Sequence, residues 1–231
     1  MSYIKRIVCL ANSYKPPNGR CIAGIDVLGH GKYGSWIRPV SARDSQEVSF
    51  SEYKYENGQS PRLLDILDVP LLKAVPHNHQ TENHVIDANA WWVKKGVLAW
   101  DDLEQLRQRP TSIWINSDHT RGGSYDCMSE AEAETLDSSL FLIKRKDFTI
   151  EVGSSTWAGK TKRTWRGKFD YKGTHYNFSV TDPVVRDALS AKEEGDYPLN
   201  DVYLCVSLTE PAPQDGRCYK LVAAVIKNPP F

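Results

Sequence analysis

The sequence predicts a mainly β protein with small helices, arranged as two OB-like β-barrel modules, and three observations carry this prediction. Short apolar runs are separated by Asn-Gly, Asp-Gly and proline-containing turns in both halves of the chain. Apolar and polar residues alternate with a period of two between residues 165 and 180, as in a strand with one buried face. In the second half, the segments follow the order strand, strand, strand, helix, strand, strand, which is that of a five-stranded Greek-key barrel.

The first 41 residues predict an antiparallel meander. Its three apolar runs are 7–10, 21–28 and 36–40, and the turn 15–19 contains Asn-Gly. A similar cassette returns near the C-terminus, where Cys205 and Cys218 flank two prolines and Asp-Gly-Arg. The likeness indicates either two related β modules or two hairpins that share turn chemistry, because turns draw on few residue types.

The middle of the chain combines further strands with short helices. We expect a strand over 63–75, a polar loop over 77–87, and a capped helix from Asp101 to Arg109. A strand over 112–115 and a second capped helix from Ser129 to about Leu136 follow. We place an N-terminal OB-like module at 1–125, a connecting segment at 126–137 and the C-terminal OB-fold module at 138–231.

The second half gives the clearer OB order. Strands are expected over 140–153, 165–171, 175–180, 202–208 and 218–226, with a helix over 184–190 after the cap Asp182-Pro183. The segment 154–163 is expected to be a flexible basic loop. In the first half, the predicted helix comes too late for a plain OB order.

Alternation assigns the faces of the hairpin 165–180. Its aromatic residues, including Trp165, should fill the barrel, while Arg166, Lys168, His175 and Asn177 should face outward. OB-folds bind oligonucleotides on this face, with help from the loops after the first and fourth strands.

Charge and composition favour a polyanionic partner in a reducing compartment. The chain is neutral overall, but six cations and one acid fall between residues 160 and 172. An odd number of cysteines, no membrane-length apolar run and no signal peptide suggest a cytoplasmic protein without a membrane partner.

The candidate nucleic-acid-binding residues combine loop cations, the outer hairpin face and two tryptophans that could stack on bases. Trp36 and Arg38 share a strand face, and we hold two interpretations of them open: exposed stacking with phosphate contact, or a barrel-filling Trp36 beside a snorkelling Arg38. The full set is Asn12, Lys15, Arg20, Trp36, Arg38, Trp157, Lys160, Lys162, Arg163, Arg166, Lys168, His175 and Asn177.

The chain also resembles the bacterial dual OB-domain proteins. The resemblance rests on CLANSYKPPNGRCIAG, GSWIRPVS, LLDILDVPL, the tryptophan-rich stretch near Trp91, FSVTDP, YLCVSLTEP and CYKLVAAVI, in this order over most of the chain. It implies two OB barrels and a nucleic-acid-binding role in prokaryotic antiviral defence, as a sensor or targeting subunit that works with a partner enzyme encoded nearby. It implies no catalytic residues.

The sequence predicts no catalysis, cofactor or metal. His77, His79, Glu82 and His84 crowd one loop, but their spacing is not that of a common zinc site. Two alternatives to nucleic-acid binding stay open. One is a protein-interaction or small-ligand-sensing subunit that docks a partner enzyme, and the other is a divergent metal-dependent nuclease whose scattered acids converge.

Overall fold

The computed structural model describes residues 2–16, 18–157 and 159–231, apart from the side chain of Trp157, and divides the chain into Met1–Arg107 and Gln108–Phe231. In the first unit, the predicted meander is formed by β1 (Tyr3–Lys15), β2 (Gly19–Gly29) and β3 (Lys32–Val40). The strands β4 (Asp65–Ala74), β5 (Asn83–Ile86) and β6 (Val93–Val97) follow.

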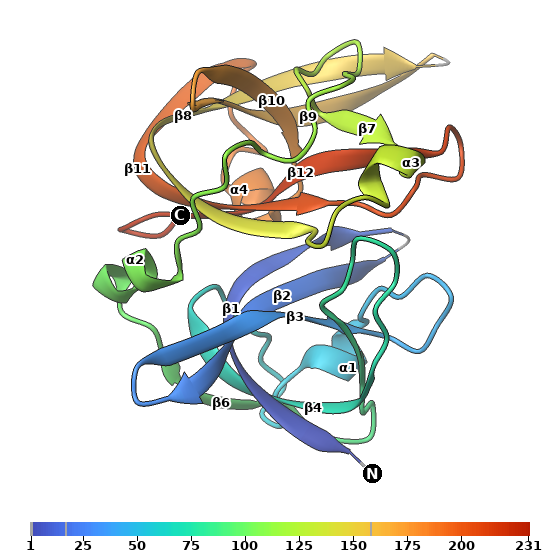
Figure 1. Ribbon diagram of the computed structural model, residues 1–231. Helices are drawn as coiled ribbons and strands as arrows, with labels where there is room; N and C mark the ends of the chain where they lie inside the picture. Colours follow the sequence, from blue (N-terminus) through green and yellow to red (C-terminus); the bar gives the residue numbers. More distant parts are fainter. Residues whose placement is uncertain (1, 17, 158) are drawn as a thin grey trace. The chain divides into compact units, whose positions relative to one another are not determined.

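Pairing closes the first barrel. β1 pairs with β2 and β4, β5 joins β4, and a parallel pairing of β3 with β5 completes the ring of five strands. A parallel contact between third and fifth strands, with antiparallel contacts elsewhere, is the topology of an OB-fold. β6 is an additional strand (Figure 1) that pairs with residues 65–68 of β4, on the edge of β4 that also pairs with β5.

The helices of the first unit correct the sequence prediction. A short helix, α1 (Phe50–Tyr53), lies between β3 and β4, which is where an OB-fold carries its helix. The expected helix over 101–109 is shorter and consists of η1 (Trp100–Asp102) and α2 (Leu103–Leu106). The first half therefore follows the OB order, and the late helix is an addition to it.

The first core lies inside this ring. Alternate residues of β1 and β4, such as Ile7, Cys9, Leu67 and Val69, are fully buried there. Burying such side chains contributes roughly 1.5–3 kcal/mol each to the free energy of folding. On β1 the intervening residues Val8 and Leu10 are also buried, although they do not belong to this core cluster.

The second unit repeats the topology with longer strands. They are β8 (Leu140–Trp157), β9 (Lys160–Tyr171), β10 (Thr174–Val180), β11 (Gly195–Leu208) and β12 (Arg217–Ile226). β8 pairs with β9 and β11, and the parallel pairing of Ser179 and Val180 with β12 closes the barrel. The helix α4 (Pro183–Ala188) lies between the third and fourth strands, as predicted.

The inward face of the second hairpin is the predicted one. Phe169, Tyr176 and Phe178 are buried and pack on one another, with ring centroids 5.3–5.5 Å apart. Gly167 also points inward, where an added Cβ would lie 2.7 Å from the ring of Phe148, so this aromatic ring fills the space above the glycine.

Residues 108–139 belong to the second unit, which differs from the expected boundary. Its buried residues Ile113, Trp114 and Met128 join the second core, and β7 (Cys127–Ser129) pairs with β12. The predicted capped helix is α3 (Glu130–Ala133), which has a capping box between Ser129 and Glu132. The predicted strand over 112–115 is wrong: this segment is irregular and packs through its side chains.

The two Cys-containing cassettes occupy different positions in their barrels. Cys9 and Cys21 lie on the first and second strands of one barrel, whereas Cys205 and Cys218 lie on the fourth and fifth strands of the other. The likeness therefore reflects shared turn chemistry rather than equivalent elements. In the described part of the chain, none of the helices has the length and apolar character needed to cross a membrane.

Candidate functional site

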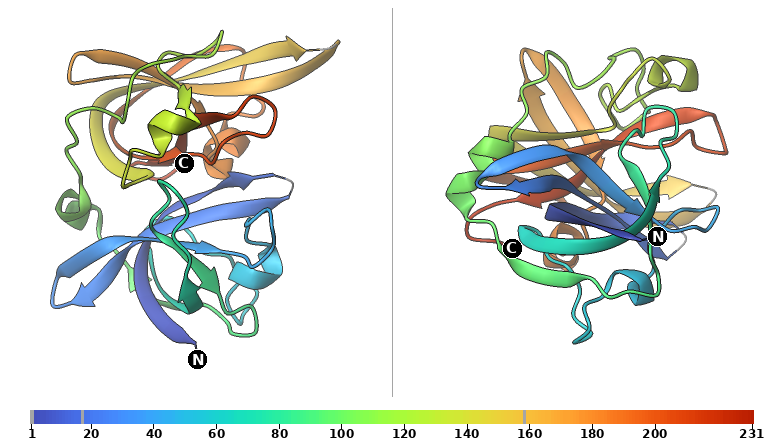
Figure 2. Two further views of the ribbon diagram at one scale, coloured as in Figure 1. Left: turned by 45° about the vertical axis from the view of Figure 1, so that its right-hand side comes forward. Right: turned by 60° about the horizontal axis from the view of Figure 1, so that its bottom comes forward.

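The end of the β8–β9 hairpin extends beyond the barrel (Figure 2). Ser154, Ser155 and Thr156 pair with Arg163, Lys162 and Thr161, so the expected flexible loop is wrong and the segment is a two-stranded ribbon. The Oγ atoms of Thr156 and Thr161 lie 2.9 Å apart across the ribbon and support the pairing.

Two exposed cations lie on this ribbon. Lys160 and Lys162 are two residues apart, so their side chains leave the same face of β9. Arg163, on the other face, is partly buried and donates hydrogen bonds to the carbonyl oxygens of Leu189 (3.4 Å) and Lys192. The sequence has no acid between Val152 and Phe169. The ribbon therefore combines exposed positive charge with a position after the first barrel strand.

Trp157, the expected stacking residue, ends β8, and its backbone pairs with Lys160. Its side chain lies outside the described residues, so its role in stacking stays a prediction.

Arg166 does not form part of an open cationic face. Its guanidinium donates to a carboxylate oxygen of Asp126 at 2.8 Å and to the side-chain oxygen of Asn177 at 3.0 Å. Asp126 is 3% exposed, and the side chain of Asn177 donates to the carbonyl oxygen of Gly122 at 3.1 Å. A bridge between Ser124 and Asn177 brings the segment 118–126 alongside β10 (Figure 1). The chain itself thus covers this part of the barrel.

The remaining outer residues of the hairpin are paired with acids. The ammonium group of Lys168 lies 3.2 Å from both Glu151 and Asp196. Burial lowers the pKa of Lys168, but hydrogen bonds to these two carboxylates outweigh burial and raise it. His175 lies 2.8 Å from Asp170. We therefore correct the expectation that this face is a continuous positive surface.

The first unit places its loop candidates at the β1–β2 turn. Tyr14 pairs with Arg20 across the turn, and the guanidinium of Arg20 lies 4.2 Å from the Tyr14 ring centroid. Lys15, the last residue of β1, is partly buried. The side chain of Asn12 donates to the carbonyl oxygen of Pro61 at 3.0 Å, so it holds the chain near β4.

Trp36 and Arg38 are both buried, which corrects the interpretation that they form an exposed stacking face. Trp36 is 8% exposed, but the residue of β3 in the first core is its neighbour Ile37, whose side chain points to the opposite face of the strand. Arg38 does not snorkel, because its side chain is 3% exposed and lies 3.0 Å from the carboxylate of Glu82. The parallel pairing of β3 with β5 brings this pair together.

The four residues of the histidine-rich loop have different surroundings. Glu82 pairs with Arg38, and Nδ1 of His84 lies 2.6 Å from the hydroxyl of Tyr3. Burial lowers the pKa of His84. His79 is buried, whereas His77 is exposed. Among the described residues, no group of three or more His, Cys, Asp or Glu side chains is arranged to hold a metal ion.

Sequence reasoning missed the covering segment 118–126 and the strand β5. The signal for the covering segment was weak, because Asp126 and its partner Arg166 are 40 residues apart. β5 is a short polar strand whose residues pair with β3 and β4, and such pairing leaves little local pattern.

Comparison with known proteins agrees with the topology of both units. A model of the family described as dual OB-containing domain matches residues 5–225. Searches of curated proteins and of solved structures found no significant match. The family match covers both barrels, and each barrel has the strand order of an OB-fold. The chain therefore belongs to the family of dual OB-containing domain proteins.

Proposed function

We propose that this protein binds nucleic acid without catalysing a reaction, and that the end of the β8–β9 hairpin is its principal contact with phosphates. The observation that carries the proposal is the exposed pair Lys160 and Lys162 on a ribbon that extends from the second barrel. OB-folds bind oligonucleotides with the loop after their first strand, which in this barrel is the turn of this hairpin.

The neighbouring residues favour a phosphate contact at the end of the hairpin over a phosphate contact at its base. Arg166 and Lys168 are held by Asp126, Glu151 and Asp196, so a phosphate would have to compete with these carboxylates. The structure shows no such ion pair for Lys160 or Lys162 among the described residues. Exposed ammonium groups that form no ion pair attract a polyanion with little desolvation cost.

A sensor or targeting role in prokaryotic defence, with a partner enzyme, forms part of the proposal and rests on the family resemblance. The absence of catalysis is also part of the proposal. In its support, three of the scattered acids are paired with cations: Asp65 with Lys94, Asp68 with Arg6, and Glu82 with Arg38. A nuclease would instead direct two or three carboxylates at one metal ion.

The test replaces Lys160 and Lys162 together by alanine and measures binding of single-stranded and duplex DNA and RNA at two salt concentrations. Each lost phosphate contact should reduce the log–log salt slope by about 0.7 on single strands and about 0.9 on duplex, so the double variant should lose about 1.4 to 1.8. Binding should weaken to a similar extent for all sequences, because phosphate contacts position a strand without specifying its bases.

The matched control replaces two exposed lysines of the first unit, Lys32 and Lys73, and removes the same charge. It should keep most of the affinity and the salt slope. Unchanged binding by the Lys160/Lys162 variant would contradict the hairpin as the contact. Cleavage of the strands that stops with a chelator would contradict the non-catalytic part of the proposal.

A further inference from the structure

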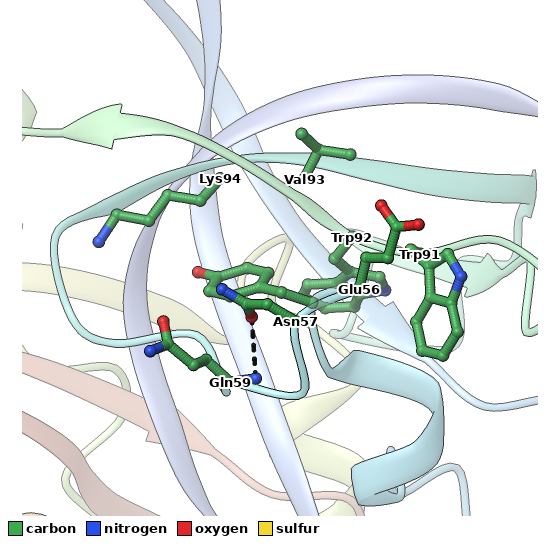
Figure 3. Close-up of a pocket in the computed structure, with 8 residues that line it drawn as sticks. Glu56, Asn57, Gln59, Trp91, Trp92, Val93 and Lys94 are labelled. Carbon is green, nitrogen blue, oxygen red and sulfur yellow. Dashed lines mark hydrogen bonds between the residues drawn. The ribbon is translucent and has the colours of Figure 1, made fainter.

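The first unit has an open pocket that the hairpin site does not use. It has a volume of about 460 Å³ and lies between the turn after α1 and the segment that leads into β6 (Figure 3). This volume falls within the range of small-molecule sites, which combine aromatic walls with a few polar groups. The lining residues are Tyr55, Glu56, Asn57, Gln59, Trp91, Trp92, Val93 and Lys94.

An exposed aromatic ring stands at this pocket. Trp91 is 47% exposed, which is unusual for a side chain that is highly buried on average. The ammonium group of Lys54 lies 5.0 Å from the centroid of the Trp91 ring and orients this ring from one side. A flat heterocycle can stack on such a platform.

The polar part of the pocket is held in place by its own hydrogen bonds. The side-chain oxygen of Asn57 accepts from the backbone N–H of Gln59 at 3.0 Å and fixes the turn. The hydroxyl of Tyr55 donates to Asp65 at 2.7 Å, and the ammonium group of Lys94 lies 2.6 Å from the same carboxylate. On this side of the pocket, the carboxylate of Asp65 is hydrogen-bonded by Tyr55 and its charge is neutralised by Lys94.

Two groups that line the pocket have no ion-pair or hydrogen-bond partner in the described part of the chain. Glu56 is exposed and is joined to no cation there, and it lines the same pocket as Trp91 (Figure 3). Trp92 is 1% exposed, and its indole N–H has no hydrogen-bond partner among the described residues. Of the two, the exposed Glu56 is the group that a ligand in the pocket can reach.

We propose that this pocket binds guanine, stacked on Trp91 with its Watson–Crick edge donating to Glu56. A carboxylate accepts two parallel hydrogen bonds, and guanine is the standard base that presents two adjacent donors, N1–H and the N2 amino group. Adenine and cytosine place an acceptor beside their amino group, and uracil flanks its single N–H with two carbonyls. A negatively charged Glu56 therefore repels these three bases and selects guanine.

The guanine comes either from a free nucleoside or nucleotide or from an unpaired base in a strand. Equilibrium dialysis of the whole protein against guanosine, adenosine, cytidine and uridine tests the first source. Shift assays with a nine-nucleotide uridine strand, with and without one central guanosine, test the second. The nucleosides carry no phosphate, so their binding does not depend on Lys160 and Lys162. The dialysis therefore tests the proposal for the pocket separately from the proposal for the hairpin.

Two variants probe the two contacts. Trp91→Ala removes the stacking platform and should weaken guanine binding about tenfold or more. Glu56→Gln keeps the size of the side chain but offers one acceptor in place of two, so it should weaken guanine binding about tenfold and reduce the preference over adenine. The matched controls Leu28→Ala and Glu193→Gln change an exposed apolar and an exposed acidic residue outside the pocket and should leave binding unchanged.

If the protein binds guanosine but none of the other three nucleosides, the pocket is a site for a free ligand. If the protein binds no nucleoside but prefers the strand that contains guanosine, and if Glu56→Gln removes this preference, the ligand is an unpaired base of a strand. Equal affinity for all four bases, no binding in either assay, or a guanine preference that survives both pocket variants would overturn the proposal.

Discussion

At the scale of single residues, the first barrel contains a buried ion pair between strands that are distant in sequence. Arg38 on β3 and Glu82 beside β5 are 3% and 5% exposed, and their charged groups lie 3.0 Å apart. Removing one partner of such a pair leaves an uncompensated charge in the interior. The sequence could not reveal this role, because an Arg beside a Trp on a strand is also typical of a nucleic-acid surface.

The variant Arg38→Met should reduce the free energy of unfolding by about 3–5 kcal/mol, since the carboxylate of Glu82 would stay buried without this ion pair. Urea denaturation measures this loss. Nucleic-acid affinity, measured on the fraction that remains folded, should not change. The double variant Arg38→Met with Glu82→Leu should recover much of the stability. A weakened affinity with unchanged stability would mean that Arg38 contacts the ligand.

A second buried charge, Lys220, lies in the second unit. Its side chain is 1% exposed, and the ammonium group donates to the carbonyl oxygen of Ile115 at 2.7 Å and to the side-chain oxygen of Asn116 at 2.9 Å. Burial lowers the pKa of Lys220 to about 7, against the opposite influence of Cys127, Asp126 and Glu132. Lys220 therefore connects stability to pH.

Between about pH 7 and pH 9, the unfolded chain keeps the proton on Lys220 while the folded chain loses it, so the free energy of unfolding should rise with pH. The gain should be of the order of 1–3 kcal/mol over this window. Denaturant unfolding of the protein and of Lys220→Met, at both ends of the window, measures it. The methionine variant should show a flatter dependence. A slope that is identical in both proteins would assign the effect to other groups.

At the scale of elements, local turn chemistry and alternation predicted most strands of both barrels. They failed where a partner far along the chain decides the structure. α1 follows Ser49 with Glu52 three residues later, and this capping signal could have located it. β5 has no comparable signal, because its ladder is formed with β3 and β4. The candidate site shows the same division: Lys160 and Lys162 are exposed as local composition indicated, whereas the covering of Arg166 by Asp126 depends on tertiary structure.

The β8–β9 ribbon allows a test at the level of an element. Replacing residues 155–162 by Asn-Gly would join Ser154 to Arg163, which already face each other across the hairpin. Residues 155, 156 and 159–162 are exposed, and none of the described residues of the removed part belongs to the second core, so the free energy of unfolding should change by about 0.5 kcal/mol or less. Nucleic-acid binding should fall at least as far as in the Lys160/Lys162 double variant. Thermal unfolding and shift assays measure the two effects, and full binding by the shortened protein would exclude the ribbon.

At the scale of the whole molecule, the net charge is zero, but the charged groups fall into two kinds: cations paired with acids, and cations that are exposed. In both units, many cations are matched by acids close by, as Lys5 is by Asp26 and Lys168 by Glu151. The end of the β8–β9 hairpin departs from this pattern. Composition therefore identified the cationic stretch, but only pairing in three dimensions distinguished its compensated residues from its exposed ones.

The position of the boundary between the two units makes a final prediction. Residues 108–137 give the second unit the buried side chains of Ile113, Trp114 and Met128, together with the pairing of β7 with β12. Losing one large buried side chain costs about 2–5 kcal/mol, which is comparable to much of the stability of a domain. A fragment of residues 108–231 should therefore fold cooperatively, whereas a fragment of residues 138–231 should not. Circular dichroism during denaturation distinguishes the two fragments. If the shorter fragment unfolds cooperatively and is as stable as the longer one, the boundary lies near residue 138, as the sequence alone predicted.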